Sequence, residues 1–124
     1  MKSISLGTAV LSILLTLPAY ANDKAPLKKS GGVLVDAKGM TVYTFDKDTA
    51  NSGKSACSGP CAQNWPPVKA ADAQPEAPYA AITREDGSKQ LTYMGKPLYT
   101  FAKDKKAGDK AGENVMGVWH TVSD

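Results

Sequence analysis

Cys57 and Cys61 are the residues whose type and spacing most directly suggest chemistry. Cysteine pairs in exported proteins are normally oxidised, and the N-terminal segment described below indicates export. We therefore predict a disulfide bond, which closes so short a loop that it contributes about 2 kcal/mol. A redox-active pair is the alternative, but thioredoxin-like sites have two intervening residues and this pair has three.

A second candidate is a metal site that contains Met116 and His120. These residues are four positions apart, so in a β-strand their side chains would share one face. A thioether with an imidazole suits copper, and Met40 or Met94 could complete the site. The competing interpretation places Met116 in the core and His120 at a surface strand end. His120 is the only histidine, which excludes a multi-histidine zinc site and leaves a histidine-dependent hydrolase a single base.

Aromatic side chains form a third candidate site. Trp65 and Trp119, with Tyr79 and Tyr93, would suit an exposed platform that binds a sugar or a peptide. Two prolines follow Trp65 and stiffen the chain there. Core packing explains the tryptophans equally well, because they occupy matching places in a repeat. We expect Trp119 to be buried and Trp65 to be the surface residue.

The elements that would position these side chains occur in two copies. Residues 39–48 align with residues 95–104 at six identical positions out of ten. Each copy ends in Trp-x-x-Val, at residues 65–68 and 119–122. The segment between the copies is rich in Ala and Pro, which is typical of a connection. The sequence therefore predicts repeat 1 at about residues 32–68, a linker at about 69–80 and repeat 2 at about 81–122.

Short β-rich runs separated by turn residues dominate both copies. Residues 33–35 and 40–45 flank a turn that ends in Gly39, which is the pattern of a hairpin. Copy two has the same arrangement around a Met-Gly turn, and an Asp-Gly pair adds a second hairpin signal. No window of the mature chain shows convincing helical periodicity. The predicted fold is all-β, with two pseudo-symmetric copies of a hairpin or meander repeat in one small domain, preceded by a signal-peptide helix.

Alternation along a strand places both rings of each copy on one face. These rings are Tyr43, Phe45, Tyr99 and Phe101. Each half-apolar sheet needs a cover, so we expect the two aromatic faces to pack together. Asp48 and Asp104 follow the strands and are expected to accept backbone N–H bonds that close the next turn. The alternative makes these two acids ligands or partner contacts.

This repeat resembles a family of bacterial secreted repeats, often labelled predicted lipoproteins. The family signature is Tyr-x-(Phe/Trp/Tyr)-x-x-Asp, which is present at residues 43–48 and 99–104. The arrangement of Cys57, Cys61 and Trp65 after the first motif is also similar to the family. The resemblance covers nearly the whole mature chain. It implies no particular activity, because the function of the family is unknown.

Residues 1–21 have the pattern of a signal peptide. Lys2 precedes an uncharged apolar run at residues 4–17, and an Ala-Tyr-Ala sequence ends at Ala21, after which we expect cleavage. The apolar run is too short for a spanning helix, and we expect no transmembrane segment after cleavage. A lipid-anchored member of the family would need a cysteine at the cleavage site. This chain has Asn22 there, so we expect no lipid anchor and a periplasmic or secreted form.

Residues 22–124 then form a mature chain long enough for one domain. Loss of Lys2 lowers the formal net charge from +3 to +2, and acids and lysines are mixed, so nucleic-acid binding is not expected. We predict a non-enzymatic envelope component or binding protein without a cofactor, whose partner is an envelope protein, a sugar or a peptide. The alternative is a periplasmic copper-binding or redox protein.

Overall fold

The computed structural model describes residues 27–71 and 75–123, which form short antiparallel strands with one short helix. The predicted signal peptide, its cleavage site and Asn22 lie outside the described residues. The prediction of an all-β fold is confirmed. In chain order the elements are β1 (Lys28–Ser30), β2 (Val33–Val35), β3 (Tyr43–Phe45), α1 (Pro60–Asn64), β4 (Tyr79–Thr83), β5 (Lys89–Tyr93), β6 (Lys96–Pro97), the 3-10 helix η2 (Val115–Gly117) and β7 (Trp119–Thr121).

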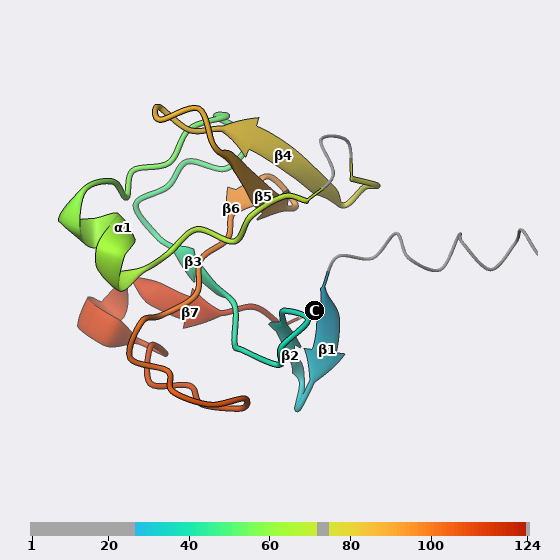
Figure 1. Cartoon of the computed structure of the whole chain (residues 1–124), viewed down its shortest axis with the longest axis vertical. Helices are drawn as coiled ribbons and strands as arrows, with labels where there is room; N and C mark the ends of the chain where they lie inside the picture. The colour runs from blue at the N-terminus through green and yellow to red at the C-terminus, as the bar shows by residue number, and fades with distance from the viewer. Residues whose placement is uncertain (1–26, 72–74, 124) are drawn as a thin grey trace, which may run out of the picture.

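Two hairpins lie at opposite ends of the molecule, β1–β2 at one end and β4–β5 at the other (Figure 1). The sequence did not indicate β1, because Lys28–Ser30 contains no apolar residue and so shows no apolar alternation. Gly31 and Gly32 form the turn between β1 and β2, with φ of 60° and 87°. A two-residue hairpin turn of this kind needs positive φ at both positions, which glycine adopts at little cost.

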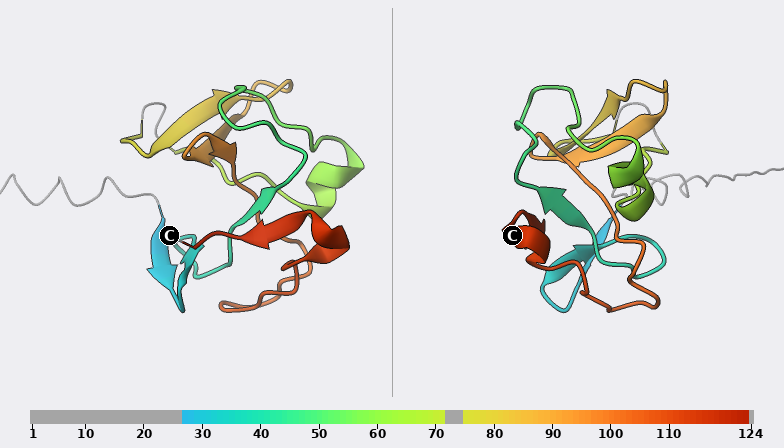
Figure 2. Two further views of the ribbon diagram at one scale, coloured as in Figure 1. Left: turned by 180° about the vertical axis from the view of Figure 1, so that it is seen from behind. Right: turned by 90° about the vertical axis from the view of Figure 1, so that its left-hand side faces the viewer.

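Between the hairpins, the two copies of the repeat are interleaved. The strand that carries the first motif, β3, pairs on one side with β7 of the second copy, in the register Phe45 to Trp119. On its other side, Tyr43 and Tyr99 exchange both backbone hydrogen bonds, at 2.7 and 2.9 Å. The second motif segment then continues to copy one, because Thr100 N–H donates to the carbonyl of Pro66. Successive segments of this layer therefore come alternately from the two copies, as the colours in Figures 1 and 2 show for β3 and β7.

The same exchange extends to the hairpins. Leu34 N–H of β2 donates to the carbonyl of Val122, in the segment after the second tryptophan. Leu91 N–H of β5 donates in the equivalent way to Val68, after the first tryptophan. Each hairpin is thus extended by the end of the other copy. We expected the two copies to pack face to face, and the structure shows in addition that they share strands.

The interior consists of an aliphatic cluster and an aromatic cluster. One lies on each face of the segments that carry the motifs. Val42 and Leu98 contribute to the aliphatic cluster, and both are fully buried. Tyr43 and Tyr99, which are adjacent to them in sequence, contribute to the aromatic cluster and are also fully buried. Alternation of side chains across a strand produces this division.

The aromatic cluster contains a continuous stack of four rings in the order Phe45, Trp119, Trp65, Phe101, with centroids 4.1, 3.7 and 4.0 Å apart. Tyr43 packs edge-on against Trp65, and Tyr99 packs edge-on against Trp119. The expectation of an exposed Trp65 is therefore wrong: only 6 % of this residue is exposed, because its ring lies between two others.

The proposed platform of four aromatic side chains does not form. Tyr79 and Tyr93 face each other across β4 and β5 with centroids 5.2 Å apart, and both pack against the aliphatic cluster. The two tryptophans belong to the other cluster and are buried. Trp65 and Trp119 are therefore core residues and offer no surface for a ligand.

Replacing Trp65 with Ala should lower the free energy of unfolding by about 3 to 5 kcal/mol, because the change opens a cavity within the ring stack. Chemical denaturation followed by circular dichroism would measure the loss. The control is Met116→Ala, since Met116 is 86 % exposed and its loss should change stability by less than about 0.5 kcal/mol. Equal effects of the two substitutions would contradict the stacked core.

Candidate functional site

The tyrosine of each motif donates a hydrogen bond to the aspartate of the other motif. Tyr43 Oη donates to Asp104 Oδ2 at 2.7 Å, and Tyr99 Oη donates to Asp48 Oδ2 at 2.6 Å. The remaining carboxylate oxygens accept backbone N–H groups, from Ala111 at Asp104 and from Ala56 at Asp48. The acids therefore hold the following loop, as the turn interpretation proposed, and they also join the two copies.

Burial raises the pKa of Tyr43 and Tyr99 well above its usual value near 10, and the hydrogen bond to the partner carboxylate adds to the effect. Both hydroxyls are therefore neutral donors at physiological pH. Burial also raises the pKa of Asp48, while its hydrogen bonds oppose that shift. In the sequence these four side chains were candidates for chemistry. In the structure they form two internal tyrosine–aspartate hydrogen bonds.

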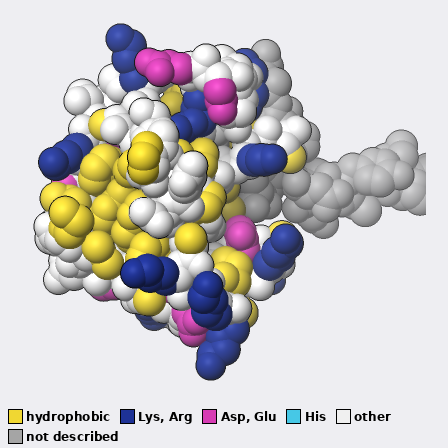
Figure 3. Space-filling view, turned by 60° about the vertical axis from the view of Figure 1, so that its left-hand side comes forward, with side chains coloured by type: hydrophobic (Ala, Val, Ile, Leu, Met, Phe, Trp, Pro, Cys, Tyr) yellow, Lys and Arg dark blue, Asp and Glu magenta, His cyan; other side chains and the backbone are white. Residues whose placement is uncertain are grey.

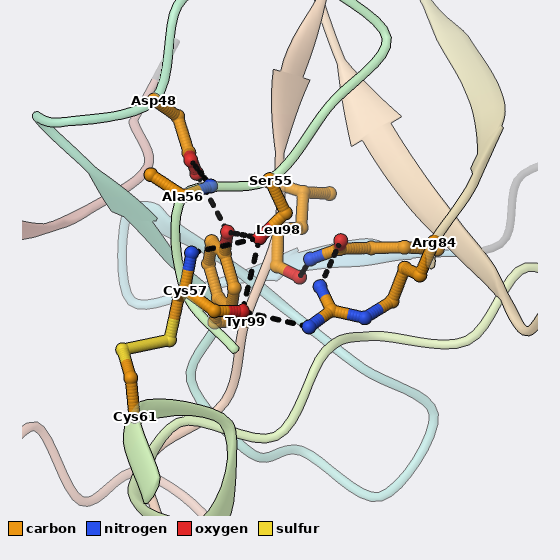
Figure 4. Close-up of a disulfide and its surroundings, with 9 residues drawn as sticks. Asp48, Ser55, Ala56, Cys57, Cys61, Arg84, Leu98 and Tyr99 are labelled. Carbon is orange, nitrogen blue, oxygen red and sulfur yellow. Dashed lines mark hydrogen bonds between the residues drawn. A yellow bond between two sulfur atoms is a disulfide. The ribbon is translucent and has the colours of Figure 1, made fainter. Parts of the chain in front are cut away.

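The predicted disulfide is present and anchors the loop before α1. Cys57 and Cys61 are joined, Cys57 is fully buried, and Cys61 lies in the first turn of α1 with part of its surface exposed. The bond fixes the main chain at Cys57, whose carbonyl accepts Arg84 Nη2 at 2.7 Å (Figure 4). The short loop thus positions an arginine that comes from a distant part of the chain.

Arg84 belongs to a hydrogen-bond network that reaches the core. Its Nη1 donates to Gln90 Oε1 at 2.7 Å, and Gln90 Nε2 donates to the carbonyl of Leu98 at 2.7 Å. On the other side, Ser55 Oγ lies 2.6 Å from Tyr99 Oη and 3.2 Å from the carbonyl of Cys57 (Figure 4). The network connects the disulfide loop, the β4–β5 hairpin and the second motif.

A groove of about 640 Å³ lies beside this network. Its lining comes from residues 53–55, 58–59 and 62 of the first copy and from residues 83–86 of the second, which begin at the last residue of β4. Lys54 and Arg84 bring positive charge to the lining, and Glu85 and Asp86 bring negative charge. Asp86 accepts two hydrogen bonds from Ser88, so the tight β4–β5 turn fixes its carboxylate in place. The lining can therefore bind polar groups of both charge signs.

An apolar surface covers the side of the molecule on which α1 lies, with lysine and arginine side chains around it (Figure 3). Cys61, Val115 and Val118 are partly buried and pack against the aromatic cluster. Met116, which follows Val115 in η2, is 86 % exposed. The two short helical turns thus cover the aromatic core and leave one large apolar side chain in solvent.

The geometry expected for a Met116 and His120 site is wrong. Met116 lies in η2 with φ of 52°, not in a strand, so the alternation argument does not apply to it. His120 lies in β7, and its Nε2 is 2.8 Å from Asp46 Oδ2 in a surface pair. Met94 is 65 % exposed in the turn before β6. Within residues 27–71 and 75–123, no three His, Cys, Asp or Glu residues are grouped so as to hold a metal ion.

Comparison with known proteins agrees with this two-copy architecture. A family model of a secreted repeat of unknown function matches the chain twice, at residues 24–69 and 80–123. The chain belongs to this family of secreted repeats. The family indicates an exported protein, and among the described residues no helix has the length and apolar character needed to cross a membrane. No curated protein and no solved structure matches the chain.

Sequence reasoning about this secreted-repeat chain missed Arg84, Gln90 and Ser55. The sequence did not mark Gln90, because this residue alternates with Leu91 and Tyr93 in β5 and its complete burial is seen only in the structure. Arg84 carried no signal either, because its partner Cys57 is distant in sequence and only the tertiary structure brings the two together. The reciprocal tyrosine and aspartate bonds were missed because local turn chemistry already explained the acids.

Stability should fall above about pH 10, where unfolded tyrosine ionises but Tyr43 and Tyr99 still hold their protons. The pKa of each of these tyrosines is higher in the folded protein than in the unfolded chain. The protonated tyrosines therefore stabilise the fold fully below the unfolded pKa, and this stabilisation decreases as the pH rises above it. Urea denaturation from pH 8 to 11 would show this decrease, with the protons of Tyr43 and Tyr99 among those released on unfolding. Y43F should lower the number of protons released by about one. Tyr79→Phe, at a partly exposed ring whose pKa burial also raises, should lower it by less. Release of both protons by the native protein near pH 10, seen as tyrosinate absorbance, would contradict the account.

Proposed function

We propose that this secreted-repeat protein is a non-enzymatic binding protein of the cell envelope, released into the periplasm after cleavage behind Ala21. Its ligand site is the groove between the disulfide loop and the β4–β5 turn. The observation that carries the proposal is Arg84, which the disulfide-anchored carbonyl of Cys57 and the amide of Gln90 hold in the groove lining. A fixed guanidinium is well suited to bind a carboxylate.

A binding role agrees with how the motif side chains are used. Tyr43, Tyr99, Asp48 and Asp104 form internal hydrogen bonds, and both hydroxyls stay neutral. General acid–base catalysis needs a group within reach of substrate and with a pKa near the working pH. The side chains that the two copies share therefore serve the fold, and the groove is formed where the copies differ.

The charges of the groove favour a short peptide over a neutral sugar. Arg84 and Lys54 can bind a terminal carboxylate, while Glu85 and Asp86 can bind an ammonium group. A peptide with free ends carries both charges, and short peptides are ordinary constituents of an envelope. The volume of the groove suits a ligand of a few residues.

Trialanine with free ends should shift the backbone amide signals of Gly53, Gly59 and Gly87 in NMR spectra of the mature protein. Blocking both ends, or offering maltotriose, should abolish the shifts because the charges are lost. Lys54→Gln and Glu85→Gln should each weaken binding about two- to fivefold, as expected for exposed charge pairs. Lys110→Gln, at an exposed lysine outside the groove lining, is the control. Identical shifts with free and blocked peptides, or none at all, would refute the proposal.

The second candidate function is copper binding at His120, which is favoured by the partly exposed ring of this residue in its surface pair with Asp46. Titration with Cu(I) in the presence of a competing chelator should then give one equivalent bound more tightly than micromolar, and His120→Ala should remove it. Exchange of the disulfide with a glutathione buffer tests the redox form of the same alternative. Absence of copper binding, together with an inert disulfide, would leave the groove as the functional site.

A further inference from the structure

The interface between the two copies has the composition of a recognition surface. We infer that each repeat recognises the other without the segment that connects them, so that this surface also accepts the complementary repeat of a second copy of this chain. The inference is independent of the ligand groove. It concerns the surface of one repeat that is buried against the other repeat, and which chains can bind to that surface.

Backbone pairing across the interface is extensive and reciprocal. Tyr43 and Tyr99 exchange two hydrogen bonds, and β3 pairs with β7 over three residues. The equivalent bonds in the other direction run from Thr100 N–H to Pro66 and from Ala102 N–H to Asn64. A single copy would leave all these strand edges unpaired, and an unpaired edge pairs readily with another chain.

The buried polar groups are complementary in the same way. Each copy presents one tyrosine hydroxyl and one aspartate, and the partner copy supplies the matching group for both. Tyr43 Oη also accepts Gly112 N–H of the second copy at 3.1 Å. A buried donor or acceptor left unsatisfied is costly, so a wrongly matched surface would be rejected.

The aromatic stack completes the surface. Its order, Phe45, Trp119, Trp65 and Phe101, alternates between the copies, so each internal contact of the stack joins one copy to the other. Separation would expose these rings as a large apolar patch of the kind that marks interaction sites. Aromatic side chains at a buried centre are also typical of the strongest binding contacts.

No described covalent bond other than the chain itself joins the copies. The disulfide between Cys57 and Cys61 lies entirely within the first copy. The connection raises the effective concentration of one repeat near the other, but it adds none of the contacts described above. Cutting the connection therefore tests recognition without altering the interface.

The experiment uses the full mature chain with a protease site inserted between Ala71 and Pro75. After folding and cleavage, the two halves should co-elute in size-exclusion chromatography at micromolar concentration. Mixing cleaved protein with a cleaved, tagged copy should then give complexes that contain one half from each. Separation of the halves in native buffer, whether folded or unfolded, would overturn the inference.

Variants test whether the reciprocal bonds supply the recognition. Tyr43→Phe and Tyr99→Phe should each raise the dissociation constant of the cleaved halves roughly ten- to a hundredfold, because each removes the tyrosine donor of one carboxylate across the interface. Tyr79→Phe removes a hydroxyl from the C-terminal half that takes no part in the reciprocal bonds, so it should have little effect. The uncut variants, measured in parallel, show that each chain still folds. Equal dissociation constants for all three variants would also overturn the inference.

Discussion

The antiparallel pairing of Tyr43 with Tyr99 is the interaction on which the rest of the structure depends. Their backbone groups hydrogen-bond to each other, and each tyrosine hydroxyl donates to the motif aspartate of the other copy. This places the two motif strands side by side and determines which segments can extend them. The ring stack, the two hairpins and the loops after the motifs are then arranged around that central pair.

The residues that occur in both copies have structural roles, and the region where a ligand can bind lies outside them. Side chains that recur in both copies are used twice in equivalent roles and are largely buried. The disulfide loop has no counterpart in the second copy, since the chain has only two cysteines. The loop carries Ser55 and the carbonyl of Cys57, and together with Arg84 it forms the groove. The asymmetric surface therefore lies where the two copies differ, while the residues that they share form the core.

Much of the local architecture could be predicted from residue patterns. The β4–β5 hairpin follows from an Asp-Gly turn between two β-rich runs, and the disulfide follows from two cysteines in an exported chain. β1 could not be predicted, because Lys28–Ser30 has no apolar alternation and forms a strand only through pairing with β2. The burial of Trp65 was missed because the residue lies beside two prolines in an irregular segment, and only the contact with Trp119 decides its exposure.

By itself, the sequence determined that there are two copies, that their strands alternate between an aromatic and an aliphatic face, and that a short disulfide loop interrupts the symmetry. These features follow from local periodicity and composition, which depend on neighbouring residues. The tertiary structure alone decided that the copies exchange strands, that each tyrosine binds the aspartate of the other copy, and that Arg84 reaches Cys57. Residues 43 and 104, or 57 and 84, are too far apart in the chain for any local pattern to specify their contact. Their pairing arises only when burial of the aromatic faces brings the two copies together.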